Sequence, residues 1–192
     1  MDILRLTLRV HDPLNTVFML PDGRPIYHIE TSSGLFSLSG DVTTIKRVDG
    51  THPTTIATID WHRVSPSTIK FDGPTYILSD FLVPSSGLFS HSKTFQGVNG
   101  QIYKWKTDPV MLFNAQKRPA AIWDPGSTSI FSKTRLATLD VIGDAQQTLD
   151  TVVVSLVVMY FEIIRHRRRR HNHGPGGGFG GGGGMNGGAG NF

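Results

Sequence analysis

The 192-residue chain contains no cysteine, which excludes disulfide bonds, thiolate metal ligands and a cysteine nucleophile. Its first residues, Met1–Arg5, interrupt their apolar positions with charges and therefore lack the unbroken hydrophobic stretch of a secretory signal. The sequence also lacks the motifs G-x-S-x-G, H-E-x-x-H and G-x-x-x-x-G-K-[ST], which mark serine hydrolases, zinc proteases and nucleotide-binding loops. From these absences we expect an intracellular protein that is not an enzyme.

Acidic residues are absent after Glu162, and this makes the charge distribution uneven. The formal net charge is +4, from 19 Lys and Arg against 15 Asp and Glu. Five of the 19 form the arginine run, which consists of Arg165, Arg167, Arg168, Arg169 and Arg170. Residues 1–164 therefore carry 19 − 5 = 14 basic and 15 acidic residues, a net charge of −1. A broadly basic surface for nucleic acid is not indicated.

Glycine is concentrated at one end of the chain, where 12 of the 22 glycines lie in residues 174–192. This segment has almost nothing to bury, and glycine loses more backbone entropy on folding than any other residue. We therefore expect a disordered glycine-rich tail over residues 171–192. Residues 1–170 are expected to form one domain, and we expect it to be monomeric.

Short segments with alternating apolar residues precede residue 143 and predict β-strands. The first, residues 4–10, alternates four apolar side chains with Arg5, Thr7 and Arg9. Pro21-Asp22-Gly23-Arg24 and Val98-Asn99-Gly100-Gln101 are typical turn sequences between such segments, and they predict two hairpins. The other expected strands are residues 16–20, 26–31, 43–48, 54–61, 68–71, 75–78, 94–95, 102–105, 111–114, 120–123 and 136–142. About twelve strands at this spacing indicate a sandwich or a barrel.

One segment near the C-terminus breaks this pattern. Residues 149–164 read LDTVVVSLVVMYFEII, which is too long for one strand and has no turn residue, so we predict a helix over about 148–165. Thr148 or Asp150 is expected to cap its start, and the arginine run suits the C-terminal end of its dipole. From Val152 to Phe161 only Ser155 is polar. A helix without a polar face must be enclosed by protein or by lipid.

The length of the apolar stretch favours enclosure by protein. A membrane-spanning helix needs about 20 apolar residues. The uninterrupted stretch here is residues 151–161, bounded by Asp150 and Glu162. We therefore expect a helix buried inside its own protein. The alternative is a short tail anchor with the arginine run on the cytosolic side of a membrane.

Several short segments carry a resemblance to known families. They are residues 12–16 (DPLNT), 27–31 (YHIET), 43–47 (TTIKR), 59–61 (IDW), 80–82 (DFL), 95–97 (FQG), 103–106 (YKWK) and 149–150 (LD), with the arginine run and the glycine-rich end. The chain resembles an uncharacterised fungal domain family of unknown function. The order of its elements also resembles the tubby-like fold of the tubby C-terminal domain, the LURP-one-related proteins and the phospholipid scramblases.

The resemblance implies a mainly β protein, a closed antiparallel tubby-like barrel of about twelve strands around a central hydrophobic C-terminal helix. Physical reasoning agrees with it, because a barrel of this width cannot be filled by the side chains of its own wall. An apolar helix can occupy the interior of such a barrel. Closure of the sheet also leaves no exposed edge strands. The family resemblance implies no activity.

The arginine run is the most specific functional signal, and it has three interpretations. It can bind anionic lipid, at ~1 kcal/mol per basic residue near a charged leaflet. It can serve nuclear import or RNA binding, or it can simply solubilise the end of a helix. By analogy with the lipid links of the tubby-like fold, we expect a non-catalytic module that associates peripherally with anionic phospholipid. The alternative is a protein- or nucleic-acid-interaction scaffold that uses the arginine run and the glycine-rich tail.

Lys104 and Lys106 flank Trp105 and form a second candidate contact for lipid or another anion. Strand alternation is the simpler interpretation, with Tyr103 and Trp105 pointing inward and both lysines in solvent. Other basic residues could join the two lysines only if the fold brings them together, namely Lys46, Arg47, Lys70 and Lys93.

A metal site, a cofactor and catalytic residues are not expected. His166, His171 and His173 cluster near the C-terminus, but the arginine run would repel a cation and no carboxylate lies near. Four acidic residues lie beside turns or strand ends, where caps and turns explain them better than acid–base catalysis does. They are Asp60, Asp72, Asp80 and Asp108.

Overall fold

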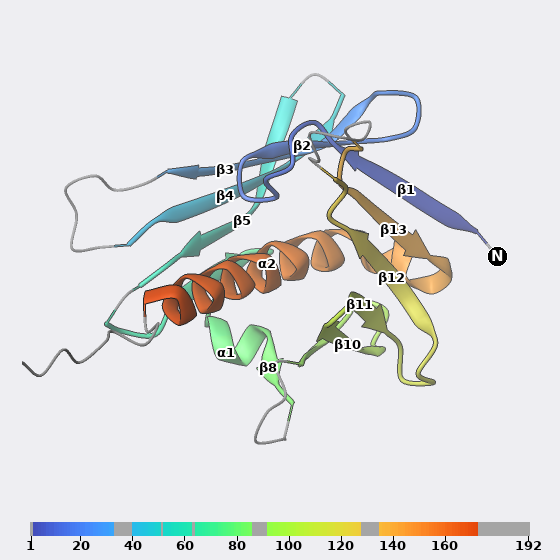
Figure 1. Cartoon of the computed structure of the whole chain (residues 1–192). Coiled ribbons are helices and arrows are strands. Elements are labelled where there is room, and N and C mark those ends of the chain that lie inside the picture. The colour runs from blue at the N-terminus through green and yellow to red at the C-terminus, as the bar shows by residue number, and fades with distance from the viewer. Residues whose placement is uncertain are drawn as a thin grey trace, which may run out of the picture.

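The computed structural model describes residues 2–32, 40–50, 52–62, 64–85, 92–127 and 135–172, with side chains as far as Arg165. Thirteen strands form one antiparallel sheet that curves around a long helix (Figure 1). The strands are β1 (Ile3–Leu8), β2 (Thr16–Met19), β3 (Pro25–Ser32), β4 (Val42–Asp49), β5 (His52–Asp60), β6 (Thr68–Phe71), β7 (Thr75–Ile77), β8 (Val83–Pro84), β9 (Lys93–Gln96), β10 (Ile102–Thr107), β11 (Val110–Phe113), β12 (Pro119–Asp124) and β13 (Thr138–Ile142).

The order of strands in the sheet is β7-β6-β5-β4-β3-β2-β1-β13-β12-β11-β10-β9-β8. Both predicted hairpins are confirmed, since β2 pairs with β3 and β9 pairs with β10. Gly23 and Gly100 adopt φ values of 82° and 74° in the two turns, which explains the need for glycine there. The pairing of β1 with β13 joins the two arms of the sheet, with Leu6 opposite Leu139.

Hydrogen-bonded closure of the sheet, expected for a barrel, is not confirmed. The edge strands are β7 and β8, and no pairing within the described residues joins them. They contain only three and two residues, so they offer few backbone groups to a partner. A short helix that was not predicted, α1 (Leu78–Phe81), connects them instead. Leu78 in α1 and Leu82 directly after it are 7% and 0% exposed, so this connection packs against the core.

Helix α2 (Leu149–Asn172) lies inside the curve of the sheet (Figure 1). Every side chain from Val152 to Met159 is at most 1% exposed, which confirms the prediction of a helix buried in its own protein. Among the described residues, one helical stretch, Gly143–Arg165, is long and apolar enough to cross a membrane. A buried core helix passes the same test, and the burial of Val152–Met159 identifies this one as the centre of the core.

The two ends of the helix differ from expectation. A 3-10 helix, η1 (Gly143–Thr148), runs directly into α2 and has no side-chain cap. Thr148 accepts a hydrogen bond from the Val98 amide, and Asp150 binds residues of the sheet, so the prediction that either caps the helix is wrong. The helical backbone also continues past residue 165 to Asn172. Arginine favours helices, and cations are stabilised at helix C-termini. The disordered tail was expected over residues 171–192, but His171 and Asn172 belong to α2, and residues 173–192 lie outside the described residues.

Candidate functional site

A pocket of about 660 Å³ lies where α2 begins. It is bounded by β4, β5, β6, the β9–β10 turn, η1 and the first turn of α2. Its lining residues are Arg47, Thr54, Thr55, Ile56, Ala57, Thr58, Lys70, Phe71, Asp72, Gly73, Val98, Gln146, Gln147, Thr148, Leu149, Asp150 and Thr151. Sequence analysis did not predict this site, because its walls come from segments up to about a hundred residues apart.

Asp150 is the centre of a polar network on one side of this pocket. Tyr27 and Arg47 face each other across β3 and β4, so both side chains can reach α2. The Tyr27 hydroxyl donates a hydrogen bond to Asp150. The Arg47 guanidinium contacts both Asp150 carboxylate oxygens at 3.1 Å and the Asp49 carboxylate at 3.0 Å. The network fixes the start of the helix to the sheet.

The network also changes the protonation chemistry of its members. Burial raises the pKa of Tyr27, and the hydrogen bond to Asp150 raises it further. The charge of Asp150 raises the pKa of Arg47. Arg47 is thus a permanent cation whose charge is balanced by two carboxylates, and it is poorly available to an incoming anion.

We expect Tyr27→Phe to lower stability by about 1–3 kcal/mol at neutral pH, because a hydrogen bond to a charged group is lost. The variant should also show a weaker pH dependence. The folded pKa of Tyr27 lies above its ordinary value of 10.0, so the folded state keeps a proton that the unfolded state releases. The stabilisation that comes from the raised pKa of Tyr27 is therefore fully present below about pH 10 and is lost as the pH rises further.

Urea unfolding at about pH 9 and about pH 11 measures this effect. Wild-type stability should fall by about 1.4 kcal/mol more than that of Tyr27→Phe across this interval. Tyr76→Phe is the matched control, because Tyr76 is 41% exposed and shows the background from other titrating groups. Equal losses in wild type and Tyr27→Phe would contradict the raised pKa.

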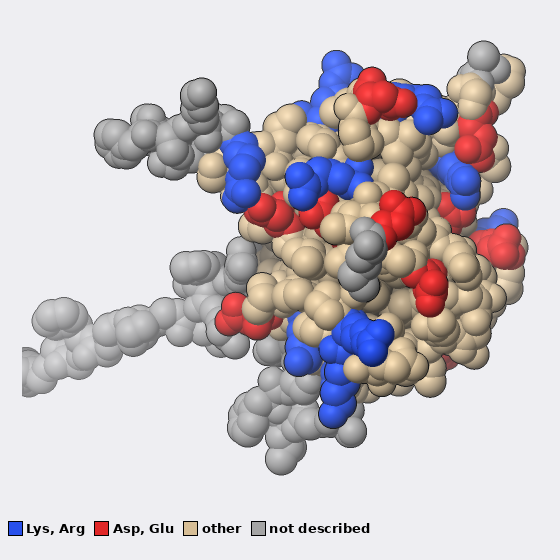
Figure 2. Space-filling view, turned by 90° about the vertical axis from the view of Figure 1, so that its right-hand side faces the viewer, with Lys and Arg blue, Asp and Glu red and all other residues tan. Residues whose placement is uncertain are grey.

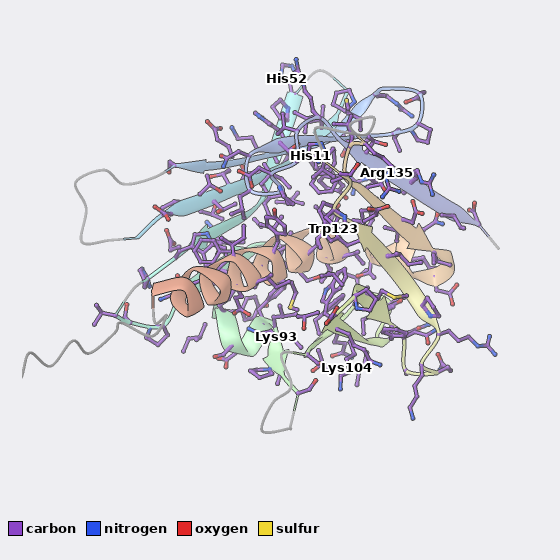
Figure 3. All side chains as sticks on the ribbon, in the orientation of Figure 1. His11, His52, Lys93, Lys104, Trp123 and Arg135 are labelled. Atoms are coloured by element: carbon purple, nitrogen blue, oxygen red, sulfur yellow. The ribbon has the colours of Figure 1, made fainter. Side chains whose placement is uncertain are left out.

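Further along α2, aromatic and polar contacts hold the helix in register. The Trp105 Nε1 group donates to Ser155 Oγ at 2.9 Å, so the single polar residue of the apolar stretch has a buried partner. Trp61 stacks on Phe161 with ring centroids 3.7 Å apart. Lys93 on β9, which is labelled in Figure 3, forms an ion pair of 2.5 Å with Glu162. The fully enclosed segment of α2 ends at Met159, and the helix continues beyond it to Asn172.

The predicted site residues fall in two places. Arg165 is half-buried near the end of α2, and Arg167–Arg170 continue its helical backbone, with side chains outside the described residues. Lys104 and Lys106 lie on the outer side of β10, since Tyr103 and Trp105 are 1% and 0% exposed. The strand alternation is therefore confirmed.

No hydrogen bond or ion pair within the described part of the chain joins either lysine of β10 to the end of α2. Lys106 instead lies over the Phe113 ring, with Nζ 4.7 Å from the centroid. Figure 3 places Lys104 on the lower strands, below the helix. Of the other basic residues considered, Arg47 and Lys70 both line the pocket, whereas Lys93 pairs with Glu162.

Within the described ranges, no group of three or more His, Cys, Asp or Glu side chains could hold a metal ion. The side chains of His166 and His171 and the whole of His173 lie outside those ranges.

Comparison with known proteins gives one result. No curated protein and no solved structure matches the chain. The model of a family of unknown function, DUF6593, matches residues 11–169, a span that contains every strand from β2 to β13 and the enclosed part of α2. The chain therefore belongs to the DUF6593 family.

Proposed function

We propose that this protein is a non-catalytic intracellular module that binds anionic membrane lipid peripherally through the arginine run. The observation that carries the proposal is the position of the run on α2. The enclosed segment ends at Met159, and the helical backbone continues to Asn172. Arg165 and Arg167–Arg170 thus share a rigid helical support that is anchored in the core. Basic residues near an anionic leaflet contribute ~1 kcal/mol each.

The charges on the rest of the protein support the same assignment. Several of its arginines are paired with acids, as in Arg5–Asp140 at 2.7 Å and Arg135–Asp124 at 2.8 Å. Figure 2 shows basic and acidic side chains interspersed on the face that it presents. Such pairs create little net field, so an anionic surface would be attracted mainly by the unbalanced arginine run.

A tubby-like relationship is part of this proposal. A central helix enclosed by an antiparallel sheet is the arrangement that the resemblance implies, although the edges here meet through α1. The analogy supplies the expectation of a lipid partner, and the resemblance of the short segments supplies the separate proposal that the chain comes from a fungal domain family. Lys104 and Lys106 are secondary candidates for contact with the same surface.

Vesicle flotation tests the proposal. Full-length protein should float with vesicles that contain phosphatidylserine, should not float with phosphatidylcholine vesicles, and should lose binding as salt is raised. Changing all five arginines of the run to Gln should remove ~5 kcal/mol, or between three and four orders of magnitude in affinity. The melting temperature should stay unchanged.

A charge-matched control separates the arginine run from net charge. It changes five exposed basic residues elsewhere to Gln, namely Arg9, Arg24, Lys70, Lys117 and Arg118. This control should keep most of the binding, and Lys104→Gln with Lys106→Gln measures the contribution of β10. Equal loss in both quintuple variants would show an effect of net charge alone. Salt-sensitive binding of RNA without vesicle binding would favour the scaffold alternative.

A further inference from the structure

The pocket at the start of α2 is lined by a threonine whose hydroxyl has no hydrogen-bond partner among the described residues. Thr151 lines the pocket and is only 3% exposed. In the part of the chain that the structure describes, no residue forms a hydrogen bond with its side chain. Because Thr151 lines the pocket, water or a ligand there can form a hydrogen bond with its hydroxyl.

Other lining side chains are also unengaged. They comprise the hydroxyls of Thr54, Thr55 and Thr58, the Gln147 amide, the Lys70 ammonium and the Asp72 carboxylate. None of them bonds through its side chain to another residue in the described ranges. Neutral donors and acceptors therefore dominate the free hydrogen-bonding capacity of the pocket.

The charges of the pocket balance, which argues against an anionic ligand. Arg47 and Lys70 are matched by Asp72 and Asp150. Arg47 is already held by Asp150, as described above, so Lys70 is the one free cation among the described lining residues. Asp150 also occupies the first turn of α2, where its charge complements the helix dipole that could otherwise attract a phosphate.

Part of the pocket lining is apolar. Ile56, Phe71 and Leu149 border the pocket, and Phe71 is held edge-on against Phe81 with centroids 5.4 Å apart. The pocket therefore combines one apolar surface, the Phe71 ring, with polar hydroxyl, amide and carboxylate groups. Sugars have the same division, with a C–H face and a rim of hydroxyls. The volume of about 660 Å³ lies within the range of small-molecule sites.

We propose that this pocket binds an uncharged, polyhydroxylated small molecule of the saccharide class. Phe71 packs against the C–H face of the ligand, the Asp72 carboxylate and Gln147 amide bind its hydroxyls, and Thr151 bonds to its most deeply placed oxygen. This site lies at the opposite end of the enclosed helix from the arginine run. The proposal is therefore independent of membrane binding.

Saturation-transfer NMR on the full-length protein tests the proposal with defined probes. The neutral probes are glucose, maltose, cellobiose and diacetylchitobiose, and the charged comparisons are glucose 6-phosphate and glycine betaine. At least one neutral saccharide should bind at millimolar concentration. Thr151→Val should weaken it about three- to tenfold, the effect of one neutral hydrogen bond. Asp72→Asn, which suits the φ of 49° at this position, should weaken it at least as much.

Thr138→Val is the matched control, because this half-buried threonine of β13 lies outside the pocket. It should bind the saccharide like wild type. The proposal is overturned if no neutral saccharide binds, or if Thr151→Val and Asp72→Asn both bind it like wild type. Stronger binding of glucose 6-phosphate than of glucose would overturn the uncharged class of ligand. Both variants should melt close to wild type, since neither side chain has a partner in the described fold.

Discussion

A chain that ends at Thr148 is expected not to fold. Seven apolar side chains of α2 between Val152 and Met159 are at most 1% exposed. Each contributes ~1.5–3 kcal/mol on burial, so together they contribute roughly 10–20 kcal/mol of gross stabilisation. A domain has a net stability of only ~5–15 kcal/mol. The sheet cannot lose this contribution and remain folded.

Expression of residues 1–148 beside the full chain measures the effect, with circular dichroism melting as the readout. The short chain should be insoluble or should show no cooperative transition. A chain that ends at Asn172 is the control, because it keeps all of α2, and it should melt like the full-length protein. A soluble 1–148 fragment with a cooperative transition would show that the sheet is stable without the helix, as a membrane-anchor role for α2 requires.

Val157→Asp is expected to have nearly the same effect through a single side chain. Val157 is 0% exposed and lies within the enclosed segment of α2. A carboxylate there would be buried without a cation, since the described ion pairs of the helix, at Asp150 and Glu162, lie outside the enclosed segment Val152–Met159. Burial of an unpaired charge costs several kcal/mol even after the protein relaxes. We therefore expect loss of the folded state or a destabilisation beyond about 4 kcal/mol.

The matched control is Val64→Asp, the same substitution at a valine that is 101% exposed. Its midpoint in urea should lie close to that of wild type, because no burial accompanies the new charge. A folded Val157→Asp protein with a wild-type midpoint would mean that this part of α2 is accessible to water in solution.

Local signals explain why most of the fold was predictable. The alternation of Leu4, Leu6 and Leu8 with polar residues fixes one face of β1, and the Asn99-Gly100 pair fixes the β9–β10 hairpin. The apolar run of α2 is long enough to be distinguished from a strand. Strand β8 and helix α1 were not predicted, because segments of two and four residues are too short to show a hydrophobic period.

The candidate site was less predictable, because it depends on long-range pairing. Asp150 has the sequence position of a helix cap, yet its partner Tyr27 lies 123 residues away. Arg47 and Lys70 were recognised as basic residues that the fold might unite, but only the register of β4, β5 and β6 brings both to one pocket. Nothing in the local sequence around Thr151 distinguishes an unpartnered hydroxyl from an ordinary core threonine.

The position of α2 in the chain has a consequence for biosynthesis. The element that fills the core is translated after all thirteen strands, and the joining strand β13 comes only shortly before it. Until then, the nascent sheet exposes the inward side chains of both arms, including Trp105 and Phe18, to solvent. Such late, non-local completion slows folding and exposes strands to aggregation. We therefore expect the nascent chain to need protection by chaperones until α2 leaves the ribosome.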